Sequence, residues 1–128
     1  MLNKTERDPL TEKIIGCCFK VHNALGPGLA EKVYHKALII AIKEANLKYE
    51  TEKSFSIFFN SNKVGLNRLD LVIGNRVIVE IKAVSGYMPK LFHSQLISYL
   101  KLSGLPIGLL INFGNERCQI KRFIHTSV

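Results

Sequence analysis

The sequence predicts an α/β fold of three layers, in which a mixed central sheet lies between helices. Two segments with helical periodicity come first, and three strand-like segments joined by short turns follow. A third helical segment then precedes two further strands, so the expected order is α-α-β-β-β-α-β-β. A three-strand meander followed by a helical crossover implies a mixed sheet with helices on both sides.

The first two helices are predicted from apolar stripes at helical spacing. Residues 10–25 form one narrow stripe, and the sequence GPG at positions 26–28 ends the segment. Residues 29–46 carry a broader apolar face that suits packing on a sheet. The stripe residues are Ile14, Cys17, Cys18, Val21 and Leu25 in the first helix, and Val33, Ala37, Leu38, Ile40, Ala41 and Ile42 in the second.

The rest of the chain changes to strand patterns, interrupted by one helix. Strands are expected at 48–59, 66–73 and 77–84, with a turn at NSNKVG between the first two. A helix from Pro89 to about residue 102 has Phe92, Leu96 and Leu100 as its core stripe. The run PIGLLINF at 106–113 predicts a strand buried on both faces, and residues 117–125 predict a half-exposed final strand.

Length and composition predict one globular domain over residues 1–128, with disorder only at 1–7 and 126–128. The net charge of +8 suits an acidic partner, and nucleic acid is favoured over an anionic membrane. Because the lysines are scattered, the charge is explained equally well as an aid to solubility.

The three cysteines show no metal-ligand spacing. They indicate a reducing cytosol, and they are expected to be small buried side chains. The polar N-terminus and the shortness of the run ALIIAI predict a cytoplasmic protein without a membrane span.

Three charged residues interrupt the apolar stretch LDLVIGNRVIVEIKAV at 69–84. Glu80 and Lys82 share one strand face because side chains alternate. Asp70 joins them if the connection GNR forms a three-residue loop, or equally if a bulge shifts the pairing, since a two-residue loop would place Asp70 opposite Val79. Gly74 and Asn75 can take the left-handed dihedrals that such a loop needs, so the odd loop is predicted.

Two carboxylates and an ammonium on one apolar face suit a hard cation with oxygen ligands. The alternative is a structural ion pair of Lys82 with Glu80 or Asp70 near a strand end.

Several motifs resemble those of one nuclease family. Asp70 followed by the sequence EIK, with Glu80 and Lys82, resembles the D…(D/E)xK signature of the PD-(D/E)XK nuclease superfamily, although Leu69 stands where that pattern has Pro. The stretch GLAEKVY, with Gly28, Glu31 and Tyr34, is similar to the motif of the GxxExxY proteins within that superfamily. The stretches RLDLV, VEIKAV, HSQLISYL and GLLINFG resemble the same proteins in the same order.

This resemblance implies a restriction-endonuclease-like fold and a role for each residue. Asp70, Glu80 and the carbonyl of Ile81 would bind Mg²⁺, with Mn²⁺ as a possible substitute. Glu31 would be a further ligand, directly or through water. Lys82 would orient the attacking water and stabilise charge on the phosphate.

The remaining site residues follow from helix spacing and from the same resemblance. Gln95 and Tyr99 are four residues apart on one helical face, and would line the site; the alternative is a partly buried polar shoulder. Glu31 and Tyr34 also share a face, and Tyr34 is expected to contact substrate, but a first-turn Glu31 is also explained by the helix dipole. Arg68 suits a phosphate contact or, equally, a structural salt bridge.

Two function classes follow. The first is a Mg²⁺-dependent nuclease that hydrolyses phosphodiester bonds, with DNA as the expected substrate. The second is a non-catalytic nucleic-acid-binding or assembly module with the same fold. For a chain this small, without a separate DNA-reading domain, a homodimer or protein partner is a possible means of holding the substrate.

Overall fold

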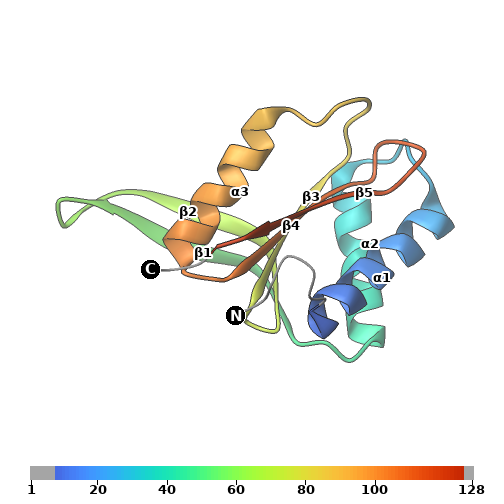
Figure 1. Ribbon diagram of the computed structural model, residues 1–128, viewed down its shortest axis with the longest axis horizontal. Coiled ribbons are helices and arrows are strands. Elements are labelled where there is room, and N and C mark those ends of the chain that lie inside the picture. Colours follow the sequence, from blue (N-terminus) through green and yellow to red (C-terminus); the bar gives the residue numbers. More distant parts are fainter. Residues whose placement is uncertain (1–7, 126–128) are drawn as a thin grey trace.

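The structure, a computed structural model, describes residues 8–125 of the chain. Eight elements follow one another in the predicted order (Figure 1). They are α1 (Pro9–Leu25), α2 (Glu31–Glu44), β1 (Tyr49–Phe59), β2 (Asn62–Ile73), β3 (Val77–Lys82), α3 (Lys90–Ser103), β4 (Ile107–Asn112) and β5 (Gln119–Ile124). The residues expected to be disordered, 1–7 and 126–128, lie outside the described range.

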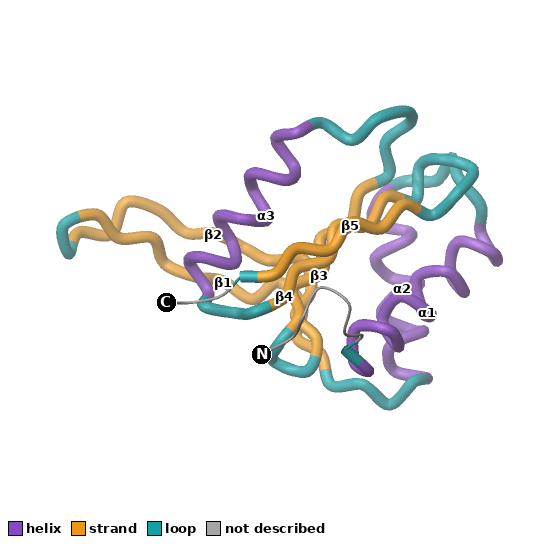
Figure 2. The backbone as a smooth tube through the Cα atoms, viewed as in Figure 1, coloured by secondary structure: helices purple, strands orange, loops and turns teal. Residues whose placement is uncertain are grey.

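One five-stranded mixed sheet forms the middle layer. The strand order is β1-β2-β3-β4-β5, and β3 and β4 form the parallel pair while their neighbours are antiparallel. The chain passes from β3 to β4 through α3, which lies across one face of the sheet (Figure 2). The α/β class, the mixed sheet and the element order are therefore confirmed.

Two apolar clusters, one on each face of the sheet, hold the layers together. The helices α1 and α2 pack on one face through Ile14, Cys18 and Leu38, against residues such as Val79 and Leu109. On the other face, α3 contributes Leu96 and Leu100, which pack against Leu69, Val72, Ile78 and Leu110. Every residue of β4 is buried, as the apolar run predicts. Cys17 and Cys18 are buried free thiols, which confirms their expected role as small core residues.

The β2–β3 hairpin has the three-residue loop that the sequence predicts. Ile73 pairs with Val77 and Leu71 with Val79, so Asp70 is aligned with Glu80. Gly74 and Asn75 have φ values of 60° and 54°, and the Arg76 amide donates to the Ile73 carbonyl at 3.1 Å. A side chain at Gly74 would be strained by its φ, and its Cβ would lie 2.7 Å from Leu10 Cδ2.

A buried carboxylate ties α1 to this loop. Asp8 is the N-cap of α1, where its Oδ2 accepts from the Thr11 amide at 3.3 Å and from Thr11 Oγ1 at 2.8 Å. Its Oδ1 lies 3.1 Å from Arg76 Nη2. Burial raises the pKa of Asp8, but the Thr11 hydrogen bonds and the Arg76 charge outweigh burial, and the net shift is downward. The first helix is thereby fastened to the turn that sets the hairpin register.

The structure departs from the predicted elements in β2. This strand begins at Asn62, not at residue 66, because the turn is only Asn60-Ser61, both with positive φ. Regular strand alternation predicts that Leu69 shares a face with Leu71, but this is wrong, since Leu69 packs on the α3 side and Leu71 on the other. Glu52 of β1 lies across from Asp70 of β2 and has a φ of 52°. Glu52 and Asp70 are not paired, although the residues on either side of them are. The alternation of faces is interrupted there, so spacing alone does not place Arg68 on the face of Asp70.

The paired ends of β1 and β2 project beyond the body of the molecule (Figure 1). We call residues 54–68 the arm. The base of this arm packs under α3 through the half-buried Phe55. Among the described residues, the structure contains no helix that is long and apolar enough to cross a membrane.

We expect Asp8→Ala to lower the free energy of unfolding by about 2 kcal/mol, because both the helix cap and a buried partner of Arg76 are lost. Urea unfolding would measure the difference. Arg76→Ala is the matched control and should cost less than about 1 kcal/mol, because Arg76 is 44% exposed and the cap survives. Equal losses in the two variants would contradict a capping role for Asp8.

Candidate active site

The charged residues of the hairpin lie on the sheet face that α3 covers. Glu80 follows Ile78 by two residues on β3, and Ile78 belongs to the α3-side cluster. Lys82 lies on the same face, where its Nζ is 4.5 Å from the centroid of the Phe92 ring on α3. The sheet register and the crossover helix together therefore place these charges under α3.

Where Asp70 and Glu80 lie opposite each other, their side chains take the place of the backbone hydrogen bonds between β2 and β3. The Asp70 amide donates to Glu80 Oε1 at 3.3 Å, and the Ile81 amide donates to Asp70 Oδ2 at 3.1 Å. The backbone pairing of the two strands extends only to Leu71 and Val79. The two carboxyl groups thus lie side by side where the backbone pairing of β2 and β3 ends, and each accepts a hydrogen bond from an amide of the other strand.

The Glu80 carboxyl is buried, and its protonation is strongly perturbed. Burial, the charge of Asp70 and a side-chain hydrogen bond with Asp70 together raise the pKa of Glu80 to about 9. The Asp70 amide and the Lys82 ammonium act in the opposite direction but do not compensate. Without a bound cation, Glu80 therefore keeps its proton at neutral pH, and the carboxyl donates it in the hydrogen bond with Asp70.

Lys82 is held by an aromatic ring and not by a carboxylate. Its ammonium lies over Phe92 in a cation–π contact, and it forms no ion pair with Asp70 or Glu80. Its charge still lowers the pKa of both Glu31 and Glu80. The structural ion pair considered as an alternative for the triplet is therefore absent, and the ammonium remains available to an anion.

Side chains from both helical layers approach the carboxylate pair. Glu31 begins α2, and much of its side chain is exposed. The atoms around its carboxyl still desolvate it in part, and this raises its pKa; the charge of Lys82 lowers the pKa, and that of Asp70 raises it further. Tyr99 is half-buried on α3, and its pKa is raised by burial and by the charges of Glu80 and Asp70. Gln95 lies one turn before Tyr99, half-buried on the same helix. Glu31 and Tyr99 are thus within electrostatic range of the pair.

Tyr34 lies elsewhere, and its predicted contact with substrate is not supported. The side chain is fully buried and stacks on Phe113, with ring centroids 4.8 Å apart. Its hydroxyl donates to the Gly26 carbonyl and accepts from the Leu29 amide. Tyr34 therefore holds the GPG connection between α1 and α2, and so fixes where Glu31 begins its helix.

Arg68 is exposed on β2 and forms no ion pair with the other described residues. The structural salt bridge that was its alternative role is therefore not found in residues 8–125.

Sequence reasoning missed Asn112, which fixes the chain after Lys82. Asn112 pairs with Lys82 in the parallel register and is fully buried. Its side chain accepts from the amides of Val84 and Gly114 at 2.9 and 3.0 Å. It donates to the Val84 carbonyl at 2.9 Å and to Gln119 Oε1 at 3.0 Å. The available signal was a polar residue at the carboxyl end of an apolar parallel strand, where α/β folds place their sites.

The donor set suits a hard divalent cation with few protein ligands. Within residues 8–125, no cluster of three His, Cys, Asp or Glu side chains lies close enough to share an ion, so Glu31 is not positioned as a direct ligand. Asp70 and Glu80 supply two adjacent carboxyls, and the Ile81 carbonyl follows them. Mg²⁺ is commonly bound by one or two carboxylates while it keeps several waters, so the residues fit this ion.

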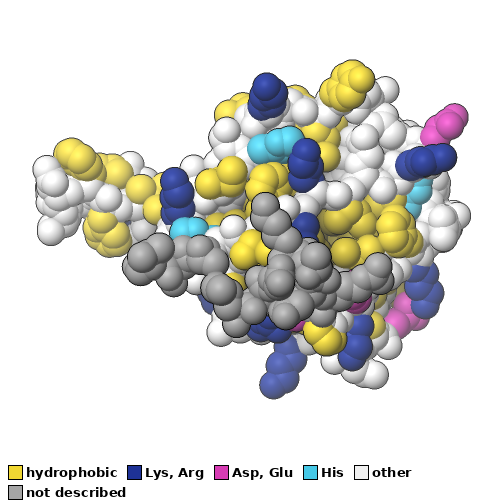
Figure 3. All heavy atoms as spheres, in the orientation of Figure 1, with side chains coloured by type: hydrophobic (Ala, Val, Ile, Leu, Met, Phe, Trp, Pro, Cys, Tyr) yellow, Lys and Arg dark blue, Asp and Glu magenta, His cyan; other side chains and the backbone are white. Residues whose placement is uncertain are grey.

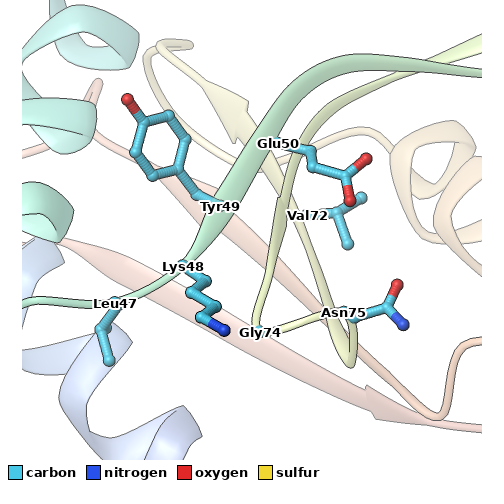
Figure 4. A pocket seen from close by; sticks show the side chains of 7 residues that line it. All are labelled: Leu47, Lys48, Tyr49, Glu50, Val72, Gly74 and Asn75. Atoms are coloured by element: carbon cyan, nitrogen blue, oxygen red, sulfur yellow. The ribbon is translucent and has the colours of Figure 1, made fainter.

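A cavity of about 660 Å³ lies at the other end of the hairpin (Figure 4). Its walls come from the α2–β1 connection, β1 and the hairpin loop, and include Leu47, Tyr49, Val72 and Asn75. None of the carboxylates or helix residues described above lines it, so it is separate from the candidate site.

The raised pKa of Glu80 predicts a pH-dependent stability. The folded protein holds this proton up to about pH 9, whereas a glutamate of the unfolded chain releases it near 4.5, so stability is lost as the pH rises through this range. In EDTA at pH 8, we expect Glu80→Gln to raise the Tm by roughly 4 °C, corresponding to about 1 kcal/mol. The gain should shrink toward pH 5. Thermal unfolding with the exposed Glu116→Gln as control would test this, and parallel pH profiles for wild type and Glu80→Gln would contradict it.

Asn112→Leu has a similar volume but leaves three backbone groups of Val84 and Gly114 without partners. We expect it to lower the free energy of unfolding by about 3 kcal/mol, as measured by urea unfolding. Asn115→Leu is the control, because its hydrogen bonds to Gly86 are exposed to water. A loss no larger than in this control would show that Asn112 does not fix the loop.

A model of the PD-(D/E)XK nuclease superfamily matches residues 8–123. A solved structure, titled "Crystal structure of SSO0001", is similar with a TM-score of 0.59 and 24% sequence identity. The similarity covers 77% of this chain and 52% of that one, so this chain spans about half of its length, and the likeness supports the fold alone. No curated protein matches the chain. The family match runs from the cap of α1 into β5 and includes the Asp70, Glu80 and Lys82 segments; the chain belongs to the PD-(D/E)XK nuclease superfamily.

Proposed function

We propose that this protein is a metal-dependent nuclease that hydrolyses phosphodiester bonds, with DNA as the expected substrate and Mg²⁺ as the expected ion. One observation carries the proposal. Asp70 and Glu80 meet where the backbone pairing of the hairpin ends, and the ammonium of Lys82, which forms no ion pair, lies on the same face. A stable core has no need of such a group of charges, whereas phosphate hydrolysis does.

The roles of the residues follow from their chemistry. Asp70, Glu80 and the Ile81 carbonyl would hold the ion, which when bound would acidify a water and neutralise phosphate charge. Glu80 must release its shared proton to serve as a ligand, so ion binding is expected to strengthen as the pH rises. Lys82 would bind a phosphate oxygen and orient the attacking water.

Glu31 would act through water from α2, and Gln95 and Tyr99 would line the site from α3. Arg68, exposed and without a carboxylate partner among residues 8–125, would bind a substrate phosphate. The GLAEKVY stretch at the start of α2 supports the narrower proposal that the chain is a GxxExxY protein.

A non-catalytic nucleic-acid-binding module is the second candidate function. It is favoured by the absence, in residues 8–125, of a third acidic or histidine ligand close to Asp70 and Glu80. Two carboxyls that share a proton bind a cation weakly, and a homodimer or protein partner would then be needed to complete the site. We propose that residues 1–128 act as one domain in the cytoplasm, where the three free cysteines remain reduced.

The test is cleavage of labelled DNA and RNA with Mg²⁺, Mn²⁺ or EDTA. We expect metal-dependent cutting that falls by roughly 10²- to 10³-fold in Lys82→Ala and Asp70→Asn, because each removes a preorganised charge. Lys101→Ala, an exposed lysine near the end of α3, is the matched control and should keep full activity. Cutting by Lys82→Ala and Asp70→Asn at the wild-type rate would reject this site, and binding without any cutting would favour the second candidate.

A further inference from the structure

The arm, residues 54–68, is an exposed two-stranded ribbon with an apolar end. Figure 3 shows hydrophobic side chains on the part that projects furthest from the body. Phe58 is 63% exposed, Phe59 68%, Val64 62% and Leu66 54%. These side chains are neighbours on paired strands, since Phe58 pairs with Lys63 and Phe59 with Asn62. Large exposed apolar side chains gathered at one end of a ribbon indicate a binding surface.

The backbone of the arm end presents the apolar side chains on both sides of the ribbon. Phe58 and Phe59 are adjacent in β1, so their side chains point to opposite faces. The register shifts between Ile57 and Phe58, which leaves Val64 as an extra, unpaired residue of β2. The tight turn at Asn60-Ser61, with both φ values positive, closes the ribbon directly beyond them. Neither phenylalanine can therefore be buried by the arm itself.

The charges of the arm favour a polyanion as its occupant. Residues 54–68 contain Lys63 and Arg68 and no Asp or Glu, so both charges of the arm are positive, and they lie on the strand paired with Phe58 and Phe59. The arm also leads directly into the candidate active site, because Asp70 follows Arg68 by two residues on the same strand. From Val64 to Asp70 the strand spans about 20 Å, which corresponds to a few nucleotides of an extended strand.

We propose that the arm binds single-stranded nucleic acid and delivers it to the candidate active site. The exposed rings of Phe58 and Phe59 stack on unpaired bases, and Lys63 and Arg68 bind the phosphates between the arm end and Asp70. Stacking requires free base faces, so the arm discriminates unpaired strands from intact duplex. The proposal rests on the proposed function, since it names the substrate class of that same site.

Equilibrium binding in EDTA tests the arm without any cleavage. The probes are a fluorescein-labelled oligothymidylate of roughly 20 nucleotides and a duplex of the same length, each titrated at several salt concentrations. We expect Phe58→Ser with Phe59→Ser to weaken binding of the single strand by roughly 5- to 150-fold per stacked base. Lys63→Gln should reduce the salt slope by about 0.7, because one phosphate contact is lost. Ile40→Ser on α2, 59% exposed, is the matched control and should bind as the wild type does.

The outcomes separate the arm from the catalytic proposal. If the Phe58/Phe59 variant loses binding while the control Ile40→Ser keeps it, the arm is the binding element whether or not the wild type cuts. If the wild type cuts in Mg²⁺ and the variant binds and cuts equally well, the arm proposal is overturned and the nuclease stands. No binding of either probe by the wild type also overturns the arm proposal. Sedimentation is run in parallel, and a dimer that becomes a monomer in the variant, with binding unchanged, would show that a second copy occupies the arm.

Discussion

The number of residues between β2 and β3 is the constraint on which the rest of this structure depends. Three residues place Asp70 opposite Glu80, whereas two would turn Asp70 toward Val79 and separate the carboxyls. The loop tolerates its conformation because Gly74 and Asn75 accept positive φ, and because Leu10 and Asp8 of the α1 segment pack against it. The first helix, although distant from the carboxylates, thus helps to maintain the register that creates them.

The regular hydrogen bonding of the sheet is interrupted where the carboxylate pair lies. At the level of Asp70, side chains take the place of backbone partners, Glu52 adopts a left-handed conformation, and a buried carboxyl retains its proton. Each of these features is unfavourable in a structure selected for stability alone, and they coincide at one point. Strong packing on both sides of this point, from the apolar residues of β3 and β4, allows the fold to accommodate them.

Sequence patterns predicted the element order and the hairpin register, because periodicity and turn residues are local properties. The position of Leu69 could not be predicted, since a backbone irregularity across from Asp70 interrupts the alternation on which the prediction rested. Tyr34 was assigned to substrate because it shares a helical face with Glu31, but long-range stacking on Phe113 buries it. Asn112 was missed because its partners, the backbone groups of Val84, are 28 residues away. What escaped prediction therefore depends on contacts between distant segments, and the roles of Glu31, Gln95 and Tyr99 stay predictions.

The β1–β2 ribbon is joined to the rest of the sheet by a short ladder. Ten residue pairs hold β1 to β2, whereas only three hold β2 to β3, and the base of the arm gains further support from α3 through Phe55 and Leu69. In terms of cooperativity, the arm has strong internal bonding and little packing on the body, and a segment of this kind opens before the whole domain unfolds. Asp70 lies at the boundary between this unit and the sheet. The geometry of the carboxylate pair is thereby coupled to the attachment of the ribbon, and anything that fastens the ribbon to the body also orders the site.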